Sequence, residues 1–187
     1  MRLAVFAFLT ALILPTSVLT PALADESKPV CASTDGFFVI AQEKSDAPGS
    51  DFLIRAMPSG AKAGACVFKP QAGDVRFPKP GADNDYTFTG VYKNRLILDA
   101  GTGTVRQIVV IDLATTKVLF KQTAYQDSKF EGHTVRFLGD GPKGTKAQCP
   151  DLSADMLANA KLEPVKILDL DTLTVTATGK SECHYEE

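Results

Sequence analysis

The chain contains short runs of β-branched and aromatic residues that are separated by turn-forming residues. This pattern limits the folds that the chain can adopt. The clearest run, 86–92, has the sequence Tyr-Thr-Phe-Thr-Gly-Val-Tyr. The strand period of two places Tyr86, Phe88 and Tyr92 on one face. A second run, 107–113, is apolar on both faces, as expected of a central strand covered on both sides. Such runs at short intervals predict antiparallel β-structure.

The same reasoning divides the rest of the chain into strands and turns. Residues 69–85 are rich in proline and glycine and predict a long irregular loop. The last predicted strand alternates threonine with apolar residues, which is typical of a strand at a sheet edge. The predicted strand segments are a hairpin of 36–41 and 52–57, a short piece at 66–68, four successive antiparallel strands within 86–125, and a final hairpin of 165–170 and 172–178.

One short helix is predicted near 153–162. Ser153 is a suitable N-cap and Asp155 lies in the first turn, where a negative charge is favourable. Pro164 is expected to end the helix. Three apolar residues are expected to share a helix face: Met156, Leu157 and Ala160. The predicted fold class is therefore mainly β, an antiparallel β-sandwich or flattened barrel with this one helix.

Two segments of the chain resemble each other. Residues 111–118 and 168–175 each contain an Asp-Leu-x-Thr turn between two strands. Hairpins of β-propeller blades have this style, but a blade needs about 40–45 residues and a closed propeller several blades. The chain is too short for that arrangement, so we interpret the pair as two similar hairpins in one domain.

The first 24 residues have the pattern of a signal peptide. Arg2 is the only charge, Leu3–Leu14 is apolar apart from one threonine, and Ala22-Leu23-Ala24 matches a cleavage site. The apolar run is shorter than the ~20 residues that span a bilayer. We therefore expect a signal peptide at 1–24, a single β-rich domain at 25–187, no membrane span after processing, and a periplasmic or secreted protein.

Charge and cysteine content restrict the partners. The chain has a formal net charge of −2 and lacks the basic stripe of a nucleic-acid-binding protein. Four cysteines in an exported chain predict two disulfides. We favour Cys31–Cys66 and Cys149–Cys183, because each pair closes a loop of about 35 residues. A metal site is disfavoured, because no C-x₂-C pair occurs and the chain has two histidines, His133 and His184. No cofactor is predicted.

The chain offers little support for catalysis. Residues 59–62, Ser-Gly-Ala-Lys, match the S-x-x-K of penicillin-recognising enzymes, but the companion motifs are missing. Gly101-Thr102-Gly103 precedes a strand rather than a helix, which favours a hairpin turn over a phosphate-binding loop. Arg106, just after this turn, is a candidate for projecting into a binding site.

Thr89-Gly90-Val91-Tyr92 resembles the S-G-x-Y motif of the periplasmic inhibitors of invertebrate-type lysozymes, with threonine in place of serine. The resemblance covers 86–125. It implies a β-sandwich whose loops enter the lysozyme cleft, where the tyrosine and the hydroxyl contact catalytic carboxylates. Such neutral groups hydrogen-bond a carboxylate without burying a further charge.

We therefore expect an exported, non-enzymatic binding protein, similar to a lysozyme inhibitor, with a protein partner such as a lysozyme. Two alternatives remain open: a structural or envelope-associated β domain, and a hydrolase of an unrecognised kind. The predicted partner-binding residues are Thr89, Gly90, Tyr92, Gly101, Gly103 and Arg106.

Overall fold

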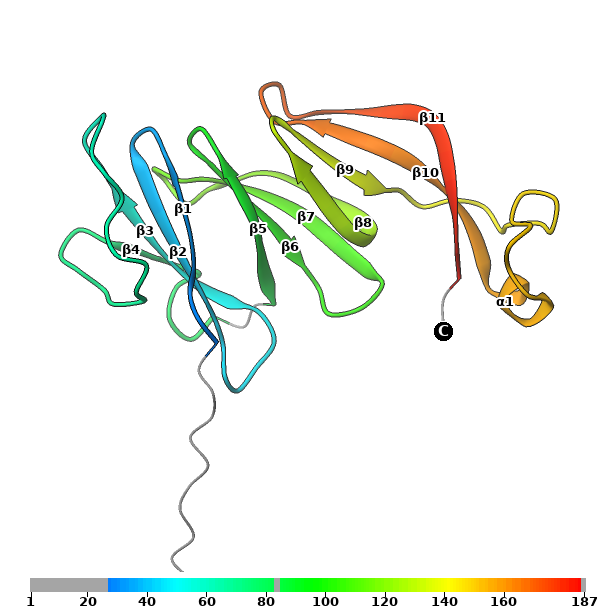
Figure 1. Cartoon of the computed structure of the whole chain (residues 1–187), viewed down its shortest axis with the longest axis horizontal. Helices are drawn as coiled ribbons and strands as arrows, with labels where there is room; N and C mark the ends of the chain where they lie inside the picture. Colours follow the sequence, from blue (N-terminus) through cyan, green and yellow to red (C-terminus); the bar gives the residue numbers. More distant parts are fainter. Residues whose placement is uncertain (1–26, 83–84, 186–187) are drawn as a thin grey trace, which may run out of the picture.

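The computed structural model describes residues 27–82 and 85–185, and the predicted signal peptide lies outside them. The described chain forms two antiparallel sheets and one short helix (Figure 1). The four-stranded sheet has the order β1-β2-β3-β4, with β1 (Val30–Thr34), β2 (Phe37–Glu43), β3 (Ser50–Ala56) and β4 (Val75–Phe77). The mainly β prediction is confirmed.

The second sheet has seven strands in chain order, each antiparallel to the next. Four strands in antiparallel succession were predicted for 86–125, and this is confirmed. The strands are β5 (Tyr86–Tyr92), β6 (Arg95–Ala100), β7 (Val105–Asp112), β8 (Val118–Glu131), β9 (Thr134–Leu138), β10 (Ala160–Asp169) and β11 (Thr174–Tyr185). As predicted, the last hairpin ends on the edge strand of its sheet.

The seven-stranded sheet curls into a half-barrel because β8 is interrupted. The pairing of β8 with β9 shifts between Tyr125 and Lys129. Gln126, inside this interruption, has a positive φ of 59°. The first half of β8 pairs with β7 and the second half with β9, so the two halves belong to opposite walls of the half-barrel (Figure 1).

Strand β7 carries apolar side chains to two cores. Val109 and Ile111 pack with Phe52 of β3 in the core between the two sheets. Ile108 and Val110 pack in the second core, inside the half-barrel. The prediction that 107–113 is a central strand covered on both faces is therefore confirmed.

The prediction that Tyr86, Phe88 and Tyr92 share a face is wrong for Tyr92. The pairing of β5 with β6 shifts between Phe88 and Gly90, which leaves Thr89 as the extra residue of a β-bulge. A single extra residue reverses the alternation that follows it. Tyr86 and Phe88 therefore contact the core between the sheets, whereas Tyr92 contacts the core of the half-barrel.

The helix is shorter than predicted. Helix α1 (Ala154–Ala158) begins after Ser153, whose hydroxyl accepts a hydrogen bond from the backbone N–H of Met156, as expected of an N-cap. Ala160 already belongs to β10, so it does not share a helix face with Met156. Pro164 does not end the helix either, because it lies within β10, where the pairing with β11 shifts.

Two further strand predictions need correction. Residues 69–85 contain β4, which pairs with β3, so they are not entirely irregular. Residues 66–68 form no strand, although Phe68 packs against the outer face of the four-stranded sheet. Strand β1 lies in a segment for which no strand was predicted.

Both disulfides join the predicted partners. Cys31 is bonded to Cys66 and Cys149 to Cys183, with Cα–Cα distances of 5.7 Å in each case. The first bond fastens the loop after β3 to β1. The second fastens the loop before α1 to the end of β11.

Candidate functional site

The six predicted partner-binding residues fall at opposite ends of β6. Tyr92 pairs with Arg95 at the first residue of β6, so Thr89, Gly90 and Tyr92 lie toward that end. The turn that contains Gly101, Gly103 and Arg106 follows the last residue of β6, Ala100. Five strand steps of about 3.4 Å separate the two ends by ~17 Å. The six residues therefore lie in two separate places on the sheet.

At the first end, Gly90 is buried beneath an aromatic ring. A Cβ placed on Gly90 would lie 2.5 Å from Cδ1 of Phe130, closer than real contacts allow. Phe130 reaches β5 because the second half of β8 folds across the half-barrel. Gly90 therefore has a packing role, and the Phe130 ring covers it on the side of the half-barrel core. Thr89, the bulge residue beside it, is half-buried.

Tyr92 is engaged within the molecule. It is half-buried, and its phenol donates to the carboxylate of Asp171, with O···O distances of 3.1 and 3.2 Å. Lys93 Nζ lies 2.5 Å from the same carboxylate. The hydrogen bond from Lys93, and secondarily that from Tyr92, lowers the pKa of Asp171. These contacts join the β5–β6 turn to the β10–β11 turn and close this end of the half-barrel.

At the second end, the chain forms the predicted hairpin turn between β6 and β7. Gly101 has a φ of 118°, which L side chains rarely adopt. Nε of Arg106 donates to the carbonyl oxygen of Gly103 at 3.0 Å, which holds the guanidinium beside the turn. Thr102, Gly103 and Thr104 are exposed.

The bend of β8 lies beside this turn. The backbone N–H of Gln126 donates to the carbonyl oxygen of Thr104 at 2.7 Å, which supports the unusual φ of Gln126. The Gln126 amide nitrogen contacts Nδ1 of His184, near the end of β11. Below them, Ser128 donates to the buried carboxylate of Asp99 at 2.8 Å.

These segments together line an open hollow of about 610 Å³, which we call the basic hollow. It combines cationic and hydroxyl groups, and none of its described lining residues carries a carboxylate. The arrangement suits a ligand that presents anionic oxygens. The hollow is lined by Thr102, Gly103, Thr104, Arg106, Gln126, Lys129 and His184.

Sequence reasoning found only part of the basic hollow. Gly103 and Arg106 were predicted, and the structure brings them together with five residues that were not predicted for binding. No local pattern marks Gln126 or Lys129, because their position depends on the bend of β8. The predicted Cys149–Cys183 bond indicates that the end of the chain is held in place. It does not predict that His184 contacts Gln126 of β8.

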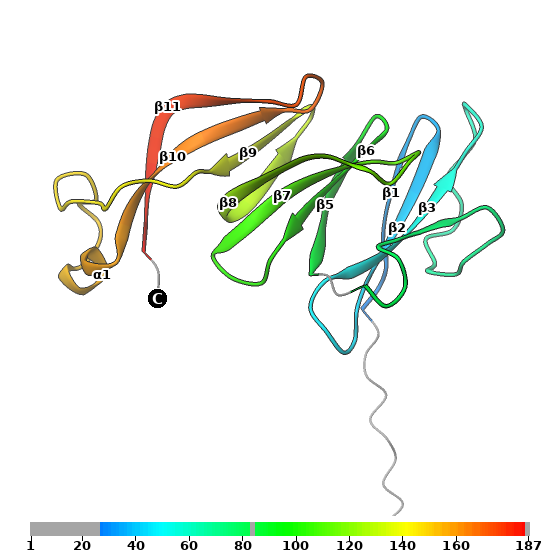
Figure 2. The ribbon, with the colours of Figure 1, turned by 180° about the vertical axis from the view of Figure 1, so that it is seen from behind.

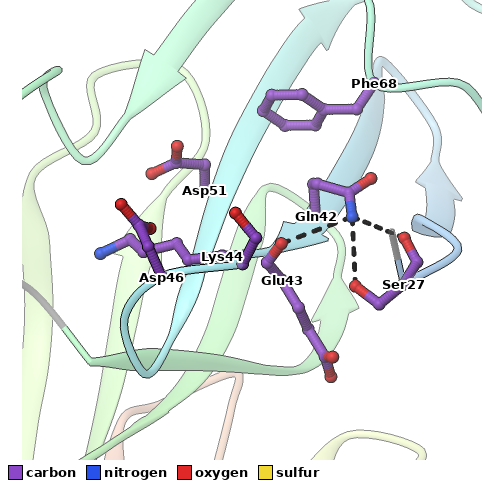
Figure 3. A pocket seen from close by; sticks show the side chains of 8 residues that line it. Ser27, Gln42, Glu43, Lys44, Asp46, Asp51 and Phe68 are labelled. Atoms are coloured by element: carbon purple, nitrogen blue, oxygen red, sulfur yellow. Dashed lines mark hydrogen bonds between the residues drawn. The ribbon is translucent and has the colours of Figure 1, made fainter. Parts of the chain in front are cut away.

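A second hollow, of about 530 Å³, lies at the β2–β3 turn (Figure 3). Three of its lining residues, Glu43, Asp46 and Asp51, carry carboxylates. A glycoside hydrolase needs two carboxyl groups that converge on the bond it cleaves. Figure 3 shows Glu43 pointing away from Asp46 and Asp51. The side-chain amide nitrogen of Gln42 donates a hydrogen bond to the carbonyl oxygen of Ser27 at 2.6 Å. Glu43 therefore does not converge with Asp46 and Asp51 in this hollow.

Metal sites and membrane-spanning helices were sought among the described residues as well. In the described part of the chain, no group of three His, Cys, Asp or Glu side chains is placed to hold a metal ion. No helix among the described residues is long and apolar enough to cross a membrane. A scan against models of protein families found no matching family. Searches of curated proteins and of solved structures found no match to this chain.

Proposed function

We propose that this protein is an exported, non-enzymatic binding protein that inhibits a lysozyme, and that the basic hollow receives carboxylates of the lysozyme cleft. The observation that carries the proposal is that Arg106 and two threonines at the β6–β7 turn line the same hollow as Lys129 of β8 and His184 of β11. The resemblance of 86–125 to lysozyme inhibitors supplies the class of partner.

The chemistry of the hollow matches that of a glycosidase cleft. Such enzymes generally place two carboxyl groups beside the bond they cleave. A guanidinium forms paired, charge-assisted hydrogen bonds with a carboxylate, and threonine hydroxyls can donate to the remaining oxygen lone pairs. The chain as a whole carries a charge of −2. That charge favours encounter with a cationic partner, while the locally basic hollow meets the carboxylates.

The proposal differs from the motif-based expectation in the residues that meet the partner. In this structure the phenol of Tyr92 already donates to Asp171, and Gly90 is covered by Phe130. A contact of Tyr92 with a partner carboxylate would have to replace the Asp171 contact. We therefore assign recognition to the Gly101–Arg106 end, and a structural role to Thr89, Gly90 and Tyr92.

A cell-wall lysis assay tests the proposal. The oxidised protein is titrated into lysozymes of several types, including the invertebrate type, and dose-dependent inhibition of one type is expected. Arg106→Ala should raise the concentration for half-inhibition at least tenfold, whereas Tyr92→Phe should leave it nearly unchanged. Raising the salt concentration should weaken inhibition, because the Debye length falls from about 10 Å at 0.1 M to about 3 Å at 1 M.

Arg76→Ala is the matched control, since it removes the same charge from β4, in the other sheet. It should inhibit as the unaltered protein does. Absence of inhibition of every lysozyme type at micromolar concentration would refute the lysozyme partner. Equal losses in Arg106→Ala and Arg76→Ala would refute the hollow as the contact surface.

A further inference from the structure

The first half of β8 has a hydrogen-bonded strand on one side only. Residues 118–125 pair with β7. On the other side, β9 pairs with β8 from Tyr125 onward, beginning opposite Leu138. Among the described residues, no strand pairs with the second edge of 118–124. We call this the open edge of β8.

The open edge exists because the chain leaves β8 early. After β9 ends at Leu138, the backbone follows β10 instead: the N–H of Gly139 donates to the Pro164 carbonyl at 2.9 Å, and that of Gly144 to the Ala160 carbonyl at 2.8 Å. Figure 2 shows the chain after β9 running toward α1. An unpaired edge presents backbone N–H and C=O groups at the spacing of a β-ladder, so another strand can form hydrogen bonds with it.

The side chains along this edge differ between its two faces. Phe120 and Ala124 pack into the core of the half-barrel. Lys121 and Thr123 are exposed. Leu119 is also 42 % exposed, although it is a large apolar residue. A strand added here would place alternate side chains beside the Phe120 face and beside the Lys121 face.

Charge indicates what kind of strand fits. Lys117 and Lys121 are exposed, and the sequence has no Asp or Glu between 113 and 126. Two copies of this chain joined through the same edge would bring their lysines together, and like charges across a strand pair are destabilising. An extended segment with acidic residues on one face is complementary instead.

We propose that the open edge of β8 binds an extended segment of a partner protein, in which apolar residues alternate with acidic ones, by adding it to the sheet as a strand. Backbone hydrogen bonds supply the affinity and the alternating side chains supply the selectivity, as in other cases of strand addition. The apolar side chains extend the face of Phe120, and the acidic ones lie near Lys121. This surface adjoins the basic hollow but shares no residue with it, because the open edge ends at residue 124 and the hollow begins on β8 with Gln126.

The test uses the full oxidised protein and a synthetic octapeptide that alternates valine with glutamate. Fluorescence polarisation should give saturable binding, and hydrogen exchange of the amides at 118–124 should slow when peptide is bound. Two further peptides carry N-methyl groups on odd or on even backbone nitrogens. One of them should bind at least tenfold more weakly, because alternate amides of an added strand face the edge. Equal binding of all three peptides would refute strand addition.

A charge exchange tests the chemistry of the partner. Lys121→Glu should bind the valine–glutamate peptide less and a valine–lysine peptide more than the unaltered protein does. Lys180→Glu, an exposed lysine on β11, is the control and should keep the original preference. Failure of the valine–glutamate peptide to bind at millimolar concentration would overturn the proposal. Reversible dimerisation that the peptide inhibits would also overturn it, since a second copy would then be the occupant.

Discussion

Asp112 and Asp169 occupy equivalent positions in two hairpins 57 residues apart, and their carboxylates receive the same pair of hydrogen bonds. The backbone N–H and the hydroxyl of Thr115 donate to Asp112 Oδ1, both at 2.8 Å. Those of Thr172 donate to Asp169 Oδ1 at 2.8 and 3.1 Å. The residue after each threonine has a positive φ, 55° and 57° respectively. The repeated Asp-Leu-x-Thr sequence therefore encodes one turn, used twice.

The leucines of the two turns are equivalent as well. Leu113 and Leu170 are buried, and their backbone N–H groups donate to the carbonyl oxygens of Asn94 and His133, each at 2.8 Å. Both acceptors lie in the tight turn of a preceding hairpin. The repeat thus extends beyond the turn itself to the contact that fastens it to the sheet.

Removing one of these carboxylates should loosen its hairpin. We expect Asp112→Ala to lower the free energy of unfolding by about 0.5–1 kcal/mol, below the range for hydrogen bonds to a buried charged group, because solvent reaches this turn. Asp169→Ala should change stability in the same direction. Chemical denaturation of both single variants and the double variant checks this, and additive effects are expected for independent turns. Stability unchanged in the double variant would contradict the interpretation.

Acid should weaken the same turns. The Thr115 hydroxyl bond lowers the pKa of Asp112, and the backbone N–H of Thr172 lowers that of Asp169. A carboxylate with a folded-state pKa below its unfolded value stabilises the fold above the unfolded pKa of about 3.9, and this contribution is lost as the pH falls through the folded pKa.

Gly90 should not tolerate a side chain. The Cβ of Gly90→Ala would lie 2.5 Å from the Phe130 ring, so the ring must move and the core of the half-barrel must repack. Overpacking of this kind costs about 1–3 kcal/mol, which thermal unfolding followed by circular dichroism can measure. Gly103→Ala is the control, because no atom lies within 4 Å of its added Cβ. Equal melting temperatures for the two variants would show that Phe130 does not cover Gly90.

The Arg55–Asp74 pair should give a second acid-sensitive contact. Arg55 makes two hydrogen bonds of 2.8 Å to the Asp74 carboxylate, whose side chain is 2 % exposed. These bonds lower the pKa of Asp74, so its contribution is complete above about pH 4 and is lost as the pH falls through the folded pKa. Asp74→Asn should cost about 1–3 kcal/mol at pH 7, from the loss of a charged hydrogen-bond partner.

The difference in unfolding free energy between Asp74→Asn and the unaltered protein should shrink as the pH is lowered below 4, in urea denaturation series. Asp51→Asn provides the control. Asp51 pairs with Arg76 at 3.5 Å in an exposed position, where ion pairs contribute little. A difference for Asp74→Asn that stays constant down to pH 2 would mean that the carboxylate charge is not what stabilises the loop.

The two disulfides should contribute similarly to stability but differently to binding. They close loops of 35 and 34 residues, so the chain-entropy model assigns each about 3–4 kcal/mol. The Cys149→Ser/Cys183→Ser variant releases the strand end that carries His184, and should lose lysozyme inhibition as well as stability. The Cys31→Ser/Cys66→Ser variant should lose stability alone. Measurements of both at a temperature where each is folded separate the two effects, and equal losses of inhibition would contradict the assignment.

Much of the local structure could be predicted from residue patterns. The β2–β3 hairpin, the central position of β7 and the Ser153 cap follow from alternation and turn residues, which are short-range properties. Both disulfides match the pairing that we favoured among the three possible ones. The face of Tyr92 could not be predicted, because Thr89 does not differ in type from residues of a regular strand. The bulge at Thr89 turns Tyr92 toward the core that also holds Phe130, whose ring lies against Gly90.

The sequence by itself determined an antiparallel β-rich chain and its hairpins, because alternation and turn chemistry act within a few residues. Tertiary structure alone decided which ends of those hairpins meet. The bend at Gln126 turns β8 from one wall of the half-barrel to the other, and the Cys149–Cys183 bond brings His184 beside it. The basic hollow and the open edge of β8 both arise at that bend, where packing of distant strands outweighs local preference.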